Sequence, residues 1–144
     1  MGKINKGEQV LDIGCGAGVD TILAVIIVGP KGSVCGVDIV SQMIARAESN
    51  LQIMALKNVK FQQVSGENLP FSDDTFDVVI SNGVINLMPE KEAAMSEIIR
   101  VLKPAGRLMV DYRCRRLIYN SPTTYPYYLE YGKSTLIAPL KQKF

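Results

Sequence analysis

The sequence contains no histidine, which removes the commonest general base and the commonest metal ligand from any chemistry that this chain performs. Cysteine is scarce too: Cys15, Cys35 and Cys114 lie far apart and form no CxxC pair. This spacing predicts neither a disulfide framework nor a zinc site, and it fits a reducing, cytoplasmic setting. We interpret Cys15 and Cys35 as small buried residues that fill space in the core, and we expect no bound metal.

A strong charge of one sign and a long apolar run are also missing. The net charge is +2, and the one local run of basic residues is Arg113, Arg115 and Arg116, so we expect no nucleic-acid partner. The most apolar run, residues 22–28, is far shorter than the ~20 residues that cross a bilayer. The first residues lack the apolar stretch of a signal peptide, and we expect no membrane partner. A chain of 144 residues has the length of one domain.

What the sequence does contain is a regular alternation of short apolar runs and amphipathic segments. The expected strands are residues 10–13, 33–39, 59–64, 76–81 and 108–111, and the expected helices are residues 19–28, 41–56 and 89–102. The many β-branched residues of the first helix leave a strand open there. Pro104-Ala105-Gly106 is expected to break the chain before the fifth strand. The alternation predicts an α/β fold, namely a Rossmann-like, doubly wound and mostly parallel sheet with helices on both faces.

The main functional signal is the glycine-rich segment at residues 10–18, VLDIGCGAG, which follows a strand and opens a helix. Such a loop lets the backbone approach a ligand closely, and the helix start favours an anionic group. A dinucleotide fingerprint requires GxGxxG, whereas this loop reads GxGxG, so a nicotinamide dehydrogenase is disfavoured. Asp38 follows Gly18 by twenty residues, at the end of the second strand, where a carboxylate can accept ribose hydroxyls. A tight turn without a ligand, and a helix-capping role for Asp38, are the alternatives.

These motifs resemble those of class I S-adenosylmethionine-dependent methyltransferases. The resemblance runs through residues 7–16 (GEQVLDIGCG), 36–39 (GVDI), 67–71 (ENLPF), 76–82 (FDVVISN) and 102–108 (LKPAGRL). Within the class, residues 81–87 (SNGVINL) and 89–91 (PEK) are most similar to arsenite methyltransferases, and much of the rest is similar to ubiquinone/menaquinone-type methyltransferases. The resemblance implies S-adenosylmethionine as the cofactor and methyl transfer to a small molecule.

The resemblance also implies a role for each matching position. Glycines 14, 16 and 18 would line the methionine part of the cofactor, Asp12 would lie near its amino group, and Asn82 near the reacting centre. Asp38 would hold the ribose diol, Ile39 would pack on the adenine, and Glu67 belongs to the adenine loop. The implied cofactor-binding set is therefore Asp12, Gly14, Gly16, Gly18, Asp38, Ile39, Glu67 and Asn82. Ser65 stands where the family often has an acid that accepts a hydrogen bond from the adenine amine.

The two ends of the chain depart from the resemblance. Only nine residues precede the expected first strand, where the family usually has helices that roof the cofactor, and residues 113–144 match no motif. We therefore divide the chain into a cofactor-binding core, residues 1–112, and a tail, residues 113–144, with a hairpin expected around residues 131–134. The fourth or fifth strand would then be an exposed edge, and exposed edges pair with other chains. This leads us to expect a homodimer with the tyrosine-rich tail near its interface.

Methyl transfer from a sulfonium needs a nucleophile placed in line with the departing sulfur, and no covalent intermediate. Without histidine, a soft nucleophile such as a thiol, arsenite or a stabilised carbanion suits this chain better than an unactivated alcohol, although an aspartate or a tyrosine can also act as a base. The alternative hypothesis is a non-catalytic module that binds the cofactor and associates with a partner.

Overall fold

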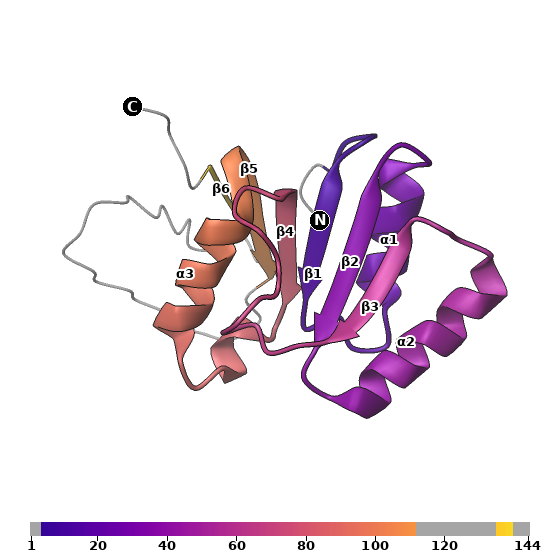
Figure 1. Cartoon of the computed structure of the whole chain (residues 1–144), viewed down its shortest axis with the longest axis horizontal. Helices are drawn as coiled ribbons and strands as arrows, with labels where there is room; N and C mark the ends of the chain where they lie inside the picture. Colours follow the sequence, from indigo (N-terminus) through magenta and orange to yellow (C-terminus); the bar gives the residue numbers. More distant parts are fainter. Residues whose placement is uncertain (1–3, 112–134, 140–144) are drawn as a thin grey trace.

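The computed structural model describes residues 4–111 and 135–139 as alternating strands and helices (Figure 1). The strands are β1 (Gln9–Ile13), β2 (Ser33–Asp38), β3 (Val59–Gln63), β4 (Phe76–Asn82), β5 (Leu102–Asp111) and β6 (Thr135–Pro139). The helices are α1 (Val19–Val28), α2 (Ser41–Met54), α3 (Lys91–Val101) and the short 3₁₀ helix η1 (Ile85–Leu87). The hairpin expected around residues 131–134 lies outside the described residues.

All six strands form one sheet in the order β3-β2-β1-β4-β5-β6. The first five strands are parallel, and β6 runs antiparallel to β5. The predicted α/β class and Rossmann-like sheet are therefore confirmed. The expectation of an exposed fourth or fifth strand is wrong, because β4 lies between β1 and β5 and because β6 occupies the outer side of β5. The strand order reverses between β1 and β4, and ligands of such sheets bind at this switch point.

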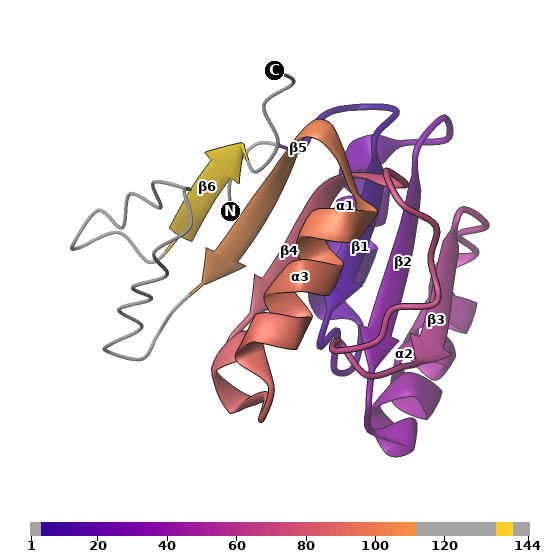
Figure 2. The same ribbon diagram turned by 60° about the vertical axis from the view of Figure 1, so that its left-hand side comes forward.

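Two apolar cores sandwich the sheet, because successive side chains of a strand point to opposite faces. Val10 belongs to the core that α1 and α2 cover, whereas Leu11 belongs to the core on the α3 face. Figure 2 shows α3 and the chain between β3 and β4 lying against that second face. Among the described residues, no helix is long and apolar enough to cross a membrane.

Residues 19–28 form a helix, α1, despite their many β-branched side chains. Its buried residues are Thr21, Ala24, Val25 and Val28, a spacing that places one helical stripe on the sheet. Gly29, with a φ of 67°, ends the helix, and its N–H donates to the carbonyl of Val25. Burial of this stripe therefore decides the conformation that local propensity leaves open.

The start of β5 differs from the expected position. Pairing with β4 begins at Leu102 and shifts register between Phe76 and Val78, so residues 103–106 form an irregularity within the strand. The predicted break at Pro104-Ala105-Gly106 is this irregularity, with β-structure on both sides of it. Ala105 has a φ of 63°, a conformation that glycine adopts more readily.

Candidate cofactor-binding site

The glycine loop leaves the carboxyl end of β1 and folds back against the end of β2. The N–H groups of Gly14 and Cys15 both donate to the carbonyl of Val37, at 2.8 and 3.0 Å. The N–H of Gly18 donates to the carbonyl of Cys15, which closes the turn before α1. Gly14, Gly16 and Gly18 have φ values of 73°, 53° and 85°, so each takes the left-handed conformation that favours glycine.

The three glycines have different surroundings, and only one faces open space. A Cβ on Gly14 would overlap the side chain of Val84, and a Cβ on Gly18 would lie 2.8 Å from the ring of Phe61. A Cβ on Gly16 would have no heavy atom within 4 Å. Packing against protein therefore explains glycine at positions 14 and 18, whereas the space beside the Gly16 backbone holds no protein atom.

Asp38 lies beside Gly16 at the end of β2. One carboxylate oxygen accepts the Gly16 N–H at 2.9 Å, and the other accepts the Val40 N–H at 2.9 Å. Each carboxylate oxygen can accept two hydrogen bonds, so both keep capacity for a ligand hydroxyl. The next residue, Ile39, is 67% exposed and gives this corner an apolar surface. The structure therefore brings Gly16, Asp38 and Ile39 together.

Asp12 occupies a different environment, beneath the loop. Its side chain is buried, and a carboxylate oxygen accepts a hydrogen bond of 2.6 Å from the Thr21 hydroxyl of α1. Burial raises the pKa of this carboxyl to about 7, the Thr21 hydrogen bond opposes the rise, and the nearby carboxylates of Asp20 and Asp38 add to it. Asp12 thus ties α1 to β1 from within the core.

Asn82 and Glu67 lie on the β4 and α3 sides of the loop. The side-chain amide of Asn82, at the end of β4, donates to a carboxylate oxygen of Asp20 at 3.2 Å. A carboxylate oxygen of Glu67 accepts the N–H of Glu90, directly before α3, at 3.1 Å. Sequence analysis missed Asp20, although an acidic residue in the first turn after a glycine loop is a usable signal.

The two described cysteines do not present thiolates. Burial is the main cause that raises the pKa of Cys15 to about 12 and that of Cys35 to about 11, so both thiols stay protonated near neutral pH. Cys15 is buried and Cys35 partly buried. Within residues 4–111 and 135–139, no group of three or more Cys, Asp or Glu side chains is arranged to hold a metal ion.

Comparison with known proteins identifies the family. Residues 4–141 match the family model described as a methyltransferase domain, and the chain belongs to this family. It is 45% identical over 105 residues to an arsenite methyltransferase of Halobacterium salinarum, covering 73% of this chain and 27% of that protein. It is 38% identical over 108 residues to a ubiquinone/menaquinone biosynthesis C-methyltransferase of Pasteurella multocida, covering 74% of this chain and 40% of that protein.

A solved structure agrees with these relatives. The arsenic(III) S-adenosylmethionine methyltransferase of Chlamydomonas reinhardtii superposes with a TM-score of 0.72 at 38% identity, covering 77% of this chain and 40% of that one. The chain thus spans well under half the length of the relatives named here.

The cofactor of this family is S-adenosylmethionine, and the residues at the carboxyl ends of β1 and β2 fit it. Gly16 leaves open space beside its backbone, the Asp38 carboxylate borders that space, and Ile39 offers an exposed apolar surface next to it. An open backbone, a carboxylate and an exposed apolar side chain are groups that suit a ligand with a polar diol and a flat apolar ring.

Proposed function

We propose that this chain binds S-adenosylmethionine at the carboxyl ends of β1 and β2 and supports transfer of its methyl group to a small molecule. The observation that carries the proposal is the contact between Asp38 and the Gly16 N–H, which places a carboxylate next to the one loop glycine that faces open space. Asp38 would accept the ribose hydroxyls, Ile39 would lie under the adenine, and the backbone at Gly16 would face the methionine part.

Bound S-adenosylmethionine supplies an electrophilic sulfonium methyl, so the chain itself needs only to orient the two reactants and exclude water. Asn82 and Asp20 stand on the β4 side of the loop, where an amide and a carboxylate can orient polar groups. Because the sequence has no histidine to act as a general base, we favour a soft nucleophile over an unactivated alcohol as the acceptor.

Arsenite and a thiol are acceptors of that kind. The described cysteines, Cys15 and Cys35, are protonated thiols near neutral pH and do not distinguish the two. The described part of the chain therefore supports a soft small-molecule acceptor without favouring arsenite over a thiol.

Calorimetric titration tests the cofactor proposal. We expect S-adenosylmethionine and S-adenosylhomocysteine to bind and NAD to bind more weakly, because the loop spacing lacks the third glycine position of a dinucleotide site. Tighter binding of NAD would refute the assignment.

A non-catalytic module that binds the cofactor and associates with a partner is the alternative. A methyl-transfer assay with thiols and arsenite separates the two functions. Cofactor binding without transfer to any acceptor would favour the module.

We also propose that the chain forms a homodimer, now on a different surface. The edge of β5 is not available for pairing, because β6 covers it. Helix α1, however, carries apolar side chains on its outer face: Val19, Leu23 and Ile26 are 64%, 44% and 56% exposed. A second copy would cover this face by helix packing. Sedimentation of the wild type and of Leu23→Glu tests it, and a wild-type monomer at tens of micromolar would contradict it.

A further inference from the structure

The chain between β3 and β4 crosses the α3 face of the sheet without forming a helix (Figure 2). We call residues 69–75 the strap. A non-helical segment on a sheet face leaves backbone groups that need partners outside its own backbone. The end of α3 supplies them: the Leu69 N–H donates to Glu97 at 2.8 Å, and the Asp74 and Thr75 N–H groups donate to the carbonyls of Arg100 and Val101.

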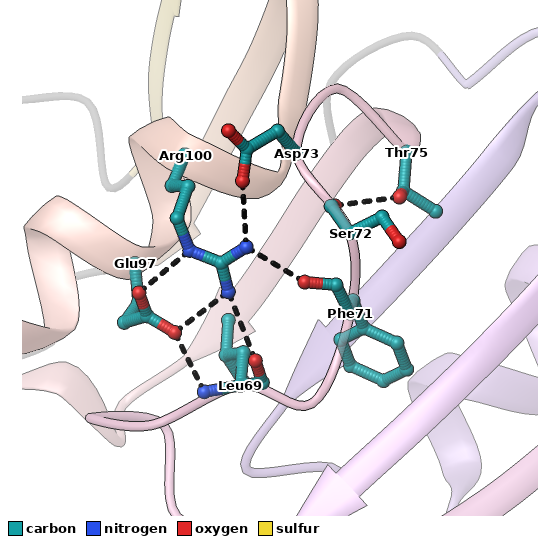
Figure 3. Close-up of polar contacts among 7 residues, drawn as sticks. All are labelled: Leu69, Phe71, Ser72, Asp73, Thr75, Glu97 and Arg100. Carbon is teal, nitrogen blue, oxygen red and sulfur yellow. Dashed lines mark hydrogen bonds and ion pairs between the residues drawn. The ribbon is translucent and has the colours of Figure 1, made fainter.

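Arg100 is the centre of these contacts (Figure 3). Its Nε and one terminal nitrogen donate to the two carboxylate oxygens of Glu97, at 2.7 and 2.8 Å. The terminal nitrogens also donate to the carbonyls of Leu69 and Phe71, at 2.9 and 2.7 Å, and to the carboxylate of Asp73 at 2.9 Å. These bonds match the five N–H donors that a guanidinium carries in a fixed planar fork.

Partial burial strengthens the pair at the centre of this cluster. The Arg100 and Glu97 side chains are 32% and 20% exposed, so both ions are shielded from much of the solvent. Hydrogen bonding from Arg100 is the main cause that lowers the pKa of Glu97, and the Leu69 N–H adds to it. The Glu97 carboxylate therefore stays ionised and keeps its contacts with both Arg100 and Leu69 at neutral pH.

The strap continues directly from a segment that borders the proposed cofactor site, residues 64–67. The Val64 N–H donates to the carbonyl of Asp38 at 3.0 Å, so this segment starts beside the end of β2. A Cβ on Gly66 would lie 3.1 Å from the Ile13 side chain, which places Gly66 at the end of β1. Leu69, the first residue held by α3, is two residues beyond Glu67.

We propose that Arg100 and Glu97 are positioning residues of the cofactor site, which hold the strap and thereby fix residues 64–67 at the adenine end. This inference rests on the proposed function, because it assigns the adenine end of that same site. Neither side chain touches Asp38, Ile39 or Gly16 in the described contacts, so their effect on binding passes through the strap. A fixed segment loses less conformational entropy on binding, which raises affinity without a new ligand contact.

The test measures binding to the full chain of S-adenosylhomocysteine and of 5′-methylthioadenosine, which lacks the amino-acid end. Arg100→Lys keeps the charge but offers three donors in place of five. We expect a loss of affinity of roughly tenfold or more for both ligands, because a lost ordering contribution of that size is within reach of a segment of a few residues. Hydrogen exchange at the Leu69 amide should accelerate relative to that of Leu11 in β1.

Matched variants separate positioning from general stability. Lys103→Gln breaks an ion pair of 3.0 Å with Asp77, the second residue after the strap, but leaves the contacts of Arg100 and Glu97 with the strap in place, and it should leave both affinities unchanged. Glu97→Gln keeps one acceptor oxygen and should give an intermediate loss, and it replaces Arg100→Lys if that variant does not fold.

The outcomes separate the proposed function from the positioning role. A wild type that binds neither ligand overturns the proposed function and this inference with it. If the wild type binds and Arg100→Lys binds equally well, only the positioning role is overturned. Equal losses in Arg100→Lys and Lys103→Gln would attribute the effect to stability and would also overturn it.

Discussion

The contrast between Gly16 and the two neighbouring loop glycines gives a direct test of the site. All three have positive φ, so an alanine at any of them costs roughly 1–2 kcal/mol in backbone strain. At Gly14 the new Cβ also overlaps Val84, and at Gly18 it meets Phe61. Overpacking of this kind adds about 1–3 kcal/mol. We therefore expect Gly14→Ala and Gly18→Ala to lower the free energy of unfolding by roughly 2–5 kcal/mol, and Gly16→Ala by roughly 1–2 kcal/mol.

For ligand binding we expect the direct steric effect at Gly16, the position with the smaller expected loss of stability. A Cβ at Gly16 would enter space that no protein atom fills. It would therefore clash with a bound cofactor and not with the protein. A clash of about 1–3 kcal/mol corresponds to a loss of affinity of roughly 5- to 150-fold. Gly7→Ala is the matched control, because Gly7 also has positive φ and open space but lies before β1, away from the site. It should lose the same stability as Gly16→Ala and keep its affinity.

Urea unfolding without ligand and calorimetry with S-adenosylhomocysteine measure the two quantities independently. If Gly16→Ala binds as tightly as Gly7→Ala, the cofactor does not approach the loop at Gly16. If Gly14→Ala is no less stable than Gly7→Ala, the packing explanation for Gly14 is wrong. The two refutations are separate, because one concerns the ligand and the other the contact between the loop and Val84.

Three further predictions follow from single side chains. Asp38→Ala should weaken S-adenosylhomocysteine binding by roughly 10- to 100-fold, because charge-assisted hydrogen bonds contribute about 1.5–3 kcal/mol each and the hydroxyls partly rehydrate; unchanged affinity in calorimetry would place the ribose elsewhere. The pKa of Asp12 rises on folding from 3.8 to about 7, so its contribution to stability is present below the lower value and is lost as pH rises through the higher one. The free energy of unfolding of Asp12→Asn should therefore lack this decrease with rising pH. A pH profile parallel to that of the wild type would contradict the prediction. Ala105→Gly should stabilise the chain by about 0.5–1 kcal/mol by relieving a φ of 63°, whereas Ala45→Gly within α2 should destabilise it by a similar amount in the same thermal assay.

The sequence was sufficient for the features that depend on local pattern. Short runs of four to seven residues that read as strands alternate with amphipathic segments. This pattern alone predicts a parallel sheet whose ligand-binding loops lie at one edge. The position of Asp38 beside the glycine loop follows from the same logic, because parallel strands end at a shared edge and Asp38 ends β2.

The features that the sequence did not reveal depend on contacts between distant segments. Gly14 is explained by Val84, seventy residues away, and the contact between Asp20 and Asn82 joins α1 to β4. The β6 strand on β5 could not be predicted either, because the pairing joins residues 107–111 to 135–139 across a segment with weak periodicity. Local patterns specify elements, whereas side-chain neighbours are set by packing.

The two sides of the candidate site differ in how firmly they are held, and this bears on where acceptor choice resides. On the β2 side, backbone hydrogen bonds join Gly14 and Cys15 to Val37, and Val64 to Asp38. On the β4 side, Asn82 is exposed and donates to Asp20, Gly83 has open space around it, and Leu87 is 80% exposed. A common cofactor requires a fixed site, whereas acceptors differ in size and chemistry and are met by segments with fewer contacts. Gly83 and Leu87 are therefore the positions at which we expect substitutions to change the acceptor without changing cofactor affinity.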